Sequence, residues 1–364
     1  MNICIIGDGL TSLSLAKNLI NKKINVHIYH KKNIKNLSSN RTIGITKDNL
    51  EFFKSEILNF SKKDVWAIKK IEIYSEKIKK KKLLNFENDK DLFYIIQNDH
   101  FYKLLNSKLL KNKHFKKKII QNDKLYEKIL NDKTYDLIIN CDSDNFLSKK
   151  YFFKTINKDY NNKAYTTILE HEKLDNKVAI QIFTKFGPIA FLPISNSFTS
   201  VVYSIDVKNH HFNDHEILDL IKNNHPNLTI KNIQKLKSFK LKSSSLRNYY
   251  YDNVLAFGDV LHKIHPLAGQ GFNMTIRDIK ILSKIIQNKI DLGMQLDSKV
   301  SKIFEKEAKS KNFIFASGID FIYEFFNFDK KINDKNLSKI LRLLNNHKGL
   351  NNFFIKIADK GLNL

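Results

Sequence analysis

The residues from Ala256 to Asp278 combine types and spacings that could bind a reactive ring. An apolar run, Asn253 to Phe257, predicts a short buried strand, and apolar residues spaced from Met274 onward predict a helix. Gly269 and Gly271 lie between them, and because glycine lacks a Cβ, the backbone there can approach a ligand closely. The free N–H groups and positive dipole end of the helix would face that ligand. A flat, electron-accepting ring that becomes anionic when reduced would suit such a site.

Two further residues of this stretch favour binding. Asp259, which follows Gly258 at the end of the predicted strand, has a carboxylate that can accept hydrogen bonds from the hydroxyls of a polyol chain. Pro266 fixes its own backbone and favours an extended conformation for Ile264 and His265 before it. The stretch therefore predicts a strand, a binding loop and a helix, in that order.

The N-terminal residues, from Asn2 to Ala16, predict another strand, tight turn and helix. Gly7 and Gly9 stand at the first two glycine positions of the pattern G-x-G-x-x-G, and Ser12 occupies the third. The first two glycines allow the turn and the approach of the backbone to a pyrophosphate at the helix N-terminus. The third position lets helix and strand pack closely, and serine is small enough to be tolerated there.

The next predicted strand, Asn25 to His30, ends without the acidic residue that a dinucleotide-binding unit places there to bind ribose hydroxyls. His30 occupies that position. Losing a charged hydrogen bond costs on the order of 1.5–3 kcal/mol, or roughly ten- to a hundredfold in affinity. A neutral His30 could accept a hydrogen bond from the ribose, and a surface histidine without a role is the alternative.

The run H-P-L-A-G-Q-G-F-N, His265 to Asn273, resembles the second FAD-binding motif of the FAD-dependent aromatic-ring hydroxylases, the p-hydroxybenzoate hydroxylase-like family. It is most similar to the branch that hydroxylates ubiquinone precursors. Arg41 matches an arginine that reaches the FAD phosphates in this family, and a guanidinium suits a bidentate phosphate contact. The resemblance implies that FAD binds to Gly7, Gly9, Ser12, His30, Arg41, Asp142, Gly258, Asp259, Pro266, Gly269, Gln270, Gly271 and Asn273.

Two other segments resemble motifs of the family. Asp142 matches the acid of an A-D-G motif that serves both FAD and NAD(P)H, although Ser143 replaces the glycine. Phe183 to Pro193 resembles the pattern F-x-x-x-G-P-x-A-x-L-P of the ubiquinone hydroxylases, in which a turn would place apolar side chains over a flat ring. The resemblance implies substrate contacts at Gly187, Pro188, Phe191 and Pro193.

The patterns and the resemblance together predict an α/β fold with an α+β insertion. A Rossmann-like FAD-binding domain would be interleaved with a β-sheet substrate domain, whose strands are indicated by period-two alternation from Ala164 to Asp206. An aromatic-rich run, Phe313 to Phe328, predicts a C-terminal helix that belongs to the core, lines a tunnel for a lipophilic substrate or touches lipid. The predicted FAD-binding domain comprises residues 1–65, 92–150 and 245–300, the substrate domain 66–91 and 151–244, and the C-terminal helices 301–364.

Composition argues against nucleic-acid binding, a disulfide framework and a metal site. The formal net charge is +26, but the lysines are spread along all 364 residues, so we expect no nucleic-acid partner and at most peripheral attraction to an anionic inner membrane. The two cysteines, Cys4 and Cys141, lie in apolar runs, which excludes a disulfide framework, argues against a metal site and fits a reducing cytoplasm. The N-terminal apolar run stops at Asp8 and predicts a strand rather than a signal peptide.

The leading hypothesis is an FAD-dependent monooxygenase that hydroxylates the ring of a polyprenylated phenol in ubiquinone biosynthesis. The resemblance implies NAD(P)H or another electron donor, O2 as co-substrate and other proteins of that pathway as partners; no catalytic residue can be assigned. Lys185 is the only charge between Phe183 and Pro193, which favours a lipophilic phenol over a benzoate. Two alternatives stay open: a flavin oxidoreductase that does not insert oxygen, and a flavin-poor binding or scaffold subunit.

Overall fold

The N-terminal strand lies inside a largely parallel sheet. The computed structural model describes residues 1–31, 41–61, 63–76, 81–87, 91–224, 228–265 and 270–331. The strands of the first sheet are β1 (Asn2–Ile6), β2 (Asn25–Lys31), β8 (Phe115–Ile120), β9 (Leu137–Asn140), β16 (Tyr250–Tyr251) and β17 (Val254–Ala256). They form six strands in the order β16-β17-β9-β1-β2-β8, parallel except for β16 at the edge.

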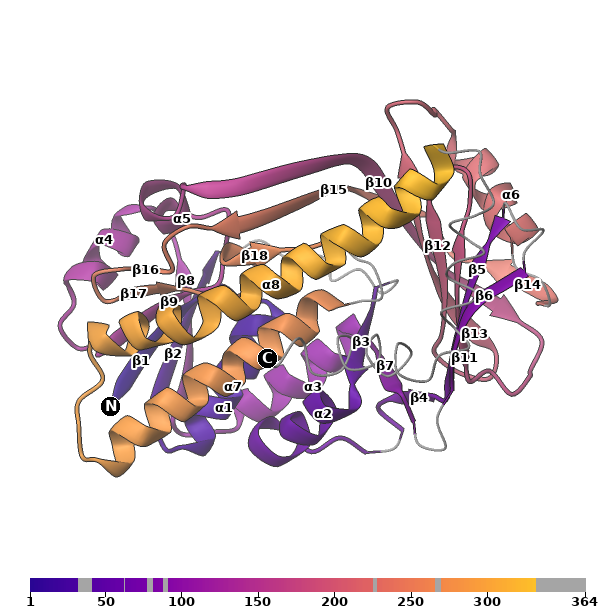
Figure 1. Cartoon of the computed structure of the whole chain (residues 1–364). Coiled ribbons are helices and arrows are strands. Elements are labelled where there is room, and N and C mark those ends of the chain that lie inside the picture. The colour runs from indigo at the N-terminus through magenta and orange to yellow at the C-terminus, as the bar shows by residue number, and fades with distance from the viewer. Residues whose placement is uncertain are drawn as a thin grey trace.

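Helices cover both faces of this sheet, as the continuous apolar sequence of its central strands requires. Ile3–Ile6 of β1 and Leu137–Ile139 of β9 are buried completely or nearly so. The covering helices are α1 (Leu10–Asn21), α3 (Asn98–Leu110), α4 (Lys124–Asn131), α5 (Phe146–Tyr151) and α7 (Gln270–Asp291). Strand order reverses after β8, and because crossovers are right-handed, α4 and α5 lie on the face opposite α1 and α3 (Figure 1).

A larger sheet, mostly antiparallel, forms the second layer. Its strands are β5 (Lys70–Ser75), β6 (Lys81–Glu87), β10 (Thr155–His171), β11 (Val178–Phe183), β12 (Pro188–Pro193), β13 (Phe198–Asp206), β14 (Ile230–Ile233), β15 (Lys237–Leu246) and β18 (His262–Lys263). Their order is β18-β15-β10-β13-β12-β11-β5-β6, with β14 beside β10. β10 and β15 form a long ribbon that reaches back to the six-stranded sheet (Figure 1). α6 (Asp214–Asn224) buries Ile217 and Ile221 against the outer face of the nine-stranded sheet.

The chain passes directly from one large sheet to the other after β17. β17 pairs with β9, whereas β18 pairs with β15 through Ser244–Lys263 and Ser245–His262. The connection contains the short 3-10 helix η3 (Gly258–Val260). Pro266 and Gly269, predicted in the binding loop that follows, lie outside the described residues. The segment that leads into this loop is therefore held by both sheets.

A small third sheet and a long helix complete the architecture. They and their neighbours are β3 (Thr42–Thr46), α2 (Lys47–Phe52), the π-helix η1 (Phe53–Ile57), β4 (Trp66–Ile68), β7 (Phe93–Gln97) and α8 (Ser298–Lys331). The Thr42 hydroxyl in β3 donates to Ser200 Oγ of the nine-stranded sheet over 3.0 Å. α8 runs along α7 and reaches the nine-stranded sheet, where Tyr323 packs on Tyr160 (Figure 1). No helix among the described residues is both long and apolar enough to cross a membrane.

This architecture confirms the predicted α/β fold class with an inserted β-sheet, and the substrate role of that sheet stays a prediction. The division into three domains stays a prediction, and residues 332–364 of the predicted C-terminal helices lie outside the described part of the chain. α7 begins at Gln270, four residues before the apolar pattern that starts at Met274. The pattern does not reveal the first turn of the helix, because that turn consists of polar and small residues together with Phe272.

Candidate cofactor and substrate site

Residues from three of the predicted FAD motifs meet at the carboxyl ends of β1, β9 and β17. Gly7 has φ +114°, and a Cβ there would lie 3.2 Å from Ser12 Oγ and 3.4 Å from the Asp142 Cβ. Gly258 has φ +62°, and its Cβ would lie only 2.6 Å from Thr11 Cγ2. Glycine adopts these backbone angles without strain and leaves the space that the neighbouring segment fills. The structure thus brings Gly7, Ser12, Asp142 and Gly258 together.

The N-terminus of α1 is open on the side of Gly9. A Cβ on Gly9 would meet no atom within 4 Å. Gly9 is the N-cap residue, and no side chain caps the helix. The first-turn N–H groups and the positive end of the helix dipole are therefore available to an anion, which is the arrangement that binds a diphosphate.

The loop after β9 is shaped by buried amides that sequence reasoning missed. Asn145 caps α5 by accepting from Ser148 N over 2.8 Å, and Asn140 donates to Ser148 Oγ over 2.8 Å. Asp142 N donates to Asn140 Oδ1 over 3.3 Å, so these groups set the position of Asp142. Ser143, the departure from the family glycine, accepts a bond from Lys263 Nζ of β18 over 3.1 Å. The sequence signal that could have indicated this arrangement is the pair of asparagines, Asn140 and Asn145, on either side of Asp142.

The residues that flank the undescribed loop differ in their surroundings. Asp259 is exposed at the end of β17. Gln270 is buried, and its Oε1 has no hydrogen-bond partner in the described part of the chain. Gly271 is the second residue of α7, and a Cβ there would lie 3.9 Å from Ile264 Cγ1. Asn273 is already engaged, because it donates to Gly44 O over 2.9 Å and accepts from Thr46 N over 3.0 Å. Asn273 thus joins α7 to β3, and Asp259 and Gln270 remain open to a ligand.

Arg41 lies at the border between the three-stranded and nine-stranded sheets. Its guanidinium is 4.6 Å from the centroid of the Phe239 ring of β15, and the residue is exposed. Its carbonyl oxygen accepts from Asn98 N over 2.9 Å. The contact of Arg41 with FAD phosphates stays a prediction.

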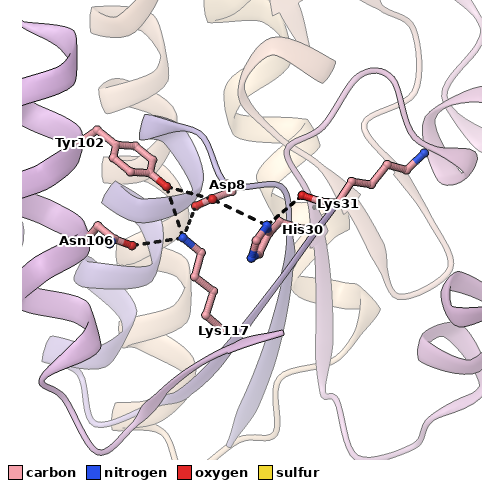
Figure 2. A network of polar contacts seen from close by, with 6 residues as sticks. All are labelled: Asp8, His30, Lys31, Tyr102, Asn106 and Lys117. Atoms are coloured by element: carbon pink, nitrogen blue, oxygen red, sulfur yellow. Dashed lines mark hydrogen bonds and ion pairs between the residues drawn. The ribbon is translucent and has the colours of Figure 1, made fainter. Parts of the chain in front are cut away.

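The end of β2 carries a polar network that includes His30 (Figure 2). His30 Nδ1 lies 3.0 Å from the Lys31 carbonyl oxygen and 3.8 Å from Asp8 Oδ2. Asp8 pairs with Lys117 Nζ of β8 over 2.9 Å and accepts from the Tyr102 hydroxyl of α3 over 2.9 Å. Sequence reasoning missed Asp8 as a site residue, although it stands between the first two glycines of the motif.

The predicted substrate strand divides its side chains between two faces. Gly187 has φ +151°, and a Cβ there would lie 1.8 Å from the Ser204 carbonyl oxygen, so only glycine fits this turn. Pro188 and Pro193 are the ends of β12 and are both buried. Phe191 packs in the core cluster beneath α6, on the outer face of the nine-stranded sheet. By alternation, Leu192 takes the opposite face, where it packs with residues of the three-stranded sheet.

An aromatic cluster surrounds His265, which lies two residues after β18 and packs on side chains of β10 and α8. The His265 ring lies 4.9 Å from the Tyr160 ring and 4.4 Å from the Tyr323 ring, centroid to centroid. Asn162 donates to the Tyr323 hydroxyl over 2.8 Å and to Ser204 Oγ over 3.2 Å, and Ser204 Oγ is 3.5 Å from His265 Nε2. We call this packed cluster of five residues the aromatic chamber. None of the five was predicted as a site residue, although His265 begins the run that resembles the second FAD-binding motif.

His265 is held neutral in the aromatic chamber. Burial lowers the pKa of His265 to about 3, because an imidazolium there would lose its hydration. His265 Nδ1 is buried and has no hydrogen-bond partner in the described part of the chain. The nearby Lys158 is paired with Glu324 over 2.9 Å and with Asp320 over 3.9 Å. The chamber therefore offers neutral hydrogen-bonding groups and aromatic faces.

A buried pair holds the strand that leads to His265. His262 Nε2 lies 2.6 Å from Asp278 Oδ2 of α7, and Asn312 of α8 donates to Asp278 Oδ1 over 2.9 Å. All three side chains are buried. These contacts join β18 to α7 and α8. Among the residues that the structure describes, no group of three histidine, cysteine or acidic residues could hold a metal ion.

The amino-acid sequence is similar to a family of FAD-binding domains and to known ubiquinone-biosynthesis enzymes. Residues 154–291 match the family model of an FAD binding domain. The chain is 27% identical over 274 residues to the mitochondrial ubiquinone biosynthesis monooxygenase COQ6 of Dictyostelium discoideum, over 61% of this chain and 55% of the relative. It is 31% identical over 152 residues to the 3-demethoxyubiquinol 3-hydroxylase of Escherichia coli K12, over 40% of this chain and 39% of the relative. These matches span about half the length of the curated relatives or less.

Solved structures share the fold over nearly the whole chain. The p-nitrophenol 4-monooxygenase of Pseudomonas putida DLL-E4 superposes with a TM-score of 0.76 at 12% identity, covering 98% of each chain. HpxO of Klebsiella pneumoniae, solved with FAD and uric acid, superposes with a TM-score of 0.75 at 11% identity, covering 98% of this chain and 96% of the other. These findings confirm the resemblance inferred from the motifs: the chain is similar in sequence to an FAD binding domain and to ubiquinone hydroxylases, and it shares its fold with a solved aromatic-ring monooxygenase.

Proposed function

We propose that this protein is an FAD-dependent monooxygenase that hydroxylates the ring of a polyprenylated phenol in ubiquinone biosynthesis. The observation that carries the proposal is the contact between separate FAD motifs, in which Gly7 lies against Asp142 and Gly258 lies against Thr11. The similarity to two ubiquinone-biosynthesis enzymes, COQ6 and 3-demethoxyubiquinol 3-hydroxylase, supports the reaction and the substrate class.

The described residues fit FAD. The uncapped N-terminus of α1 beside Gly9 would bind the diphosphate, and the exposed Asp259 would accept hydrogen bonds from the ribityl hydroxyls. Gln270 at the start of α7, whose Oε1 has no hydrogen-bond partner within the described ranges, would face the ring end of the cofactor. When bound, FAD supplies the electron transfer and the oxygen chemistry, with NAD(P)H proposed as the electron donor.

The aromatic chamber suits a neutral, lipophilic phenol. Tyr160 and Tyr323 provide aromatic faces that exclude water, and His265 can accept a hydrogen bond from a phenol hydroxyl at Nδ1, which has no partner among the described residues. A benzoate would need a free cation, because burying an unpaired carboxylate is costly, and Lys158 beside the chamber is already paired. A prenyl tail needs no counter-ion and gains about 0.8 kcal/mol for each methylene that it buries.

The positive net charge of the chain supports a membrane surface as the place where the protein binds its substrate. A net charge of +26 would attract the protein to anionic lipids, in which a prenylated phenol dissolves. We therefore place the reaction on the cytoplasmic side of a membrane that the protein contacts peripherally, with other ubiquinone-biosynthesis proteins as partners.

The test begins with the absorption spectrum of the purified protein, which should show bound oxidised flavin. The flavin-loaded protein is then given NAD(P)H, O2 and two phenols that share a ring but differ in the prenyl tail. We expect a hydroxylated product, formed faster from the prenylated phenol when substrate is limiting. NAD(P)H oxidation without hydroxylated product would favour the non-oxygenating oxidoreductase. A colourless protein that takes up no FAD would favour the flavin-poor binding subunit.

A further inference from the structure

We propose that Asp8, in the glycine loop, replaces the missing acid at the end of β2 as the acceptor for the adenosine ribose hydroxyls of FAD. This inference rests on the proposed FAD binding and concerns one part of that site. A dinucleotide-binding unit needs a carboxylate near the end of its second strand. Here that strand ends in His30, and the acid comes from the neighbouring loop instead.

Asp8 lies beside the position that the absent acid would occupy. Its Oδ2 is 3.8 Å from His30 Nδ1, and Figure 2 shows the two side chains pointing toward one another from adjacent strand ends. Both side chains are partly open to solvent, with 24% of Asp8 and 21% of His30 exposed. A ligand at the end of β2 can therefore reach the Asp8 carboxylate.

Neighbouring groups orient Asp8 and leave part of it unused. Lys117 Nζ is 2.9 Å from Oδ1, and the Tyr102 hydroxyl donates to Oδ2 over 2.9 Å. Burial and the Asp8 carboxylate raise the pKa of Tyr102, so its hydroxyl stays protonated and continues to donate. Oδ1 is buried beside Lys117, whereas Oδ2 accepts one bond from Tyr102 and keeps a further acceptor position for a ribose hydroxyl.

Lys117 is itself held in place. It also donates to the Tyr102 hydroxyl over 3.3 Å and to Asn106 Oδ1 over 3.2 Å, as Figure 2 shows. Because α3 and β8 both contact the carboxylate, the side chain of Asp8 is fixed before any ligand binds. Such pre-positioning lowers the entropic cost of binding.

The experiment measures FAD affinity together with that of an FAD analogue whose adenosine carries 2′,3′-dideoxyribose. Flavin fluorescence gives the Kd of each for the wild-type chain, Asp8→Asn, and Asp8→Asn with His30→Glu. The wild type should bind FAD roughly ten- to a hundredfold more tightly than the analogue. Asp8→Asn should bind both ligands alike, at about the affinity of the wild type for the analogue. Adding His30→Glu should restore the preference, because it returns an acid to the strand end.

Asp64→Asn is the matched control. Asp64 is 19% exposed and lies 2.9 Å from His100 Nε2, so it is another partly buried carboxylate beside a histidine. Its variant should keep the wild-type preference for FAD. If Asp8→Asn also keeps that preference, or if it loses affinity for both ligands by the same factor, the assignment of the ribose to Asp8 is wrong while FAD binding stands. A wild type that binds neither ligand overturns the proposed function and this inference together.

Discussion

Gly258 and Thr11 touch across the carboxyl ends of β17 and β1, where a Cβ on Gly258 would lie 2.6 Å from Thr11 Cγ2. The contact joins the segment before the predicted flavin loop to the first turn of α1. The site thus depends on glycine for space as well as for backbone angle.

Replacing Gly258 by alanine should destabilise the fold by more than backbone strain alone. Gly258 and Gly293 have nearly the same backbone angle, φ +62° and +66°, but a Cβ on Gly293 meets nothing within 4 Å. Gly293→Ala should therefore lose about 1–2 kcal/mol from strain, and Gly258→Ala a further 1–3 kcal/mol from the clash with Thr11. Urea unfolding measures both, and equal losses would contradict the proposed contact.

Asp259→Ala should weaken FAD binding without loosening the fold. The side chain is exposed at the end of β17, so its removal leaves no buried group unpaired. Loss of a charged acceptor for the ribityl hydroxyls should raise the Kd roughly ten- to a hundredfold. Flavin fluorescence measures the Kd, and Asp175→Ala, an exposed acid of the β10–β11 connection, is the control. Full flavin occupancy in Asp259→Ala would remove Asp259 from the site.

His265 should make the fold more sensitive to acid. Its pKa is about 3 in the folded state and about 6.5 when unfolded, so the unfolded chain binds the extra proton between these values. Stability therefore falls as pH is lowered through this window, by about 1.4 kcal/mol per pH unit. The advantage of the wild type over His265→Gln in unfolding free energy should shrink by about 2 kcal/mol between pH 7.5 and pH 5. His215→Gln, at an exposed position, should show no such change.

The buried pair of His262 and Asp278 should matter far more than a similar pair on the surface. His262→Leu leaves the Asp278 side chain buried beside Asn312, which still donates to its Oδ1, and should cost about 3 kcal/mol of unfolding free energy or more. The comparison is His100→Leu, which breaks a 2.9 Å contact with Asp64 at a partly exposed site and should cost less than about 1 kcal/mol. Equal losses in denaturant unfolding would show that burial does not decide the effect.

Sequence patterns predicted the fold class because strands, turns and helices leave local signals, whereas a shared ligand for the glycine motifs was implied by the family resemblance. Gly7 and Gly258 occupy turns with positive φ, which few other residues adopt easily, so their positions could be read directly. The aromatic chamber could not be predicted from the sequence. Asn162, Ser204 and Tyr323 come from two separate strands and a helix, which meet only in the folded chain. Phe191 shows a different difficulty: alternation along β12 indicates two faces but not which of them meets the ligand.

The order of strands in the six-stranded sheet also has a consequence for the timing of synthesis. The glycine turn lies at the carboxyl end of β1, yet its neighbours there come much later in the chain: Cys141 N, directly after β9, donates to Ile6 O, and β17 follows only at Val254. A ribosome exposes the first turn long before it has made the strands that complete the pocket. A nascent N-terminal half cannot retain a dinucleotide through these contacts, so the chain can acquire its cofactor only once most of it has been translated.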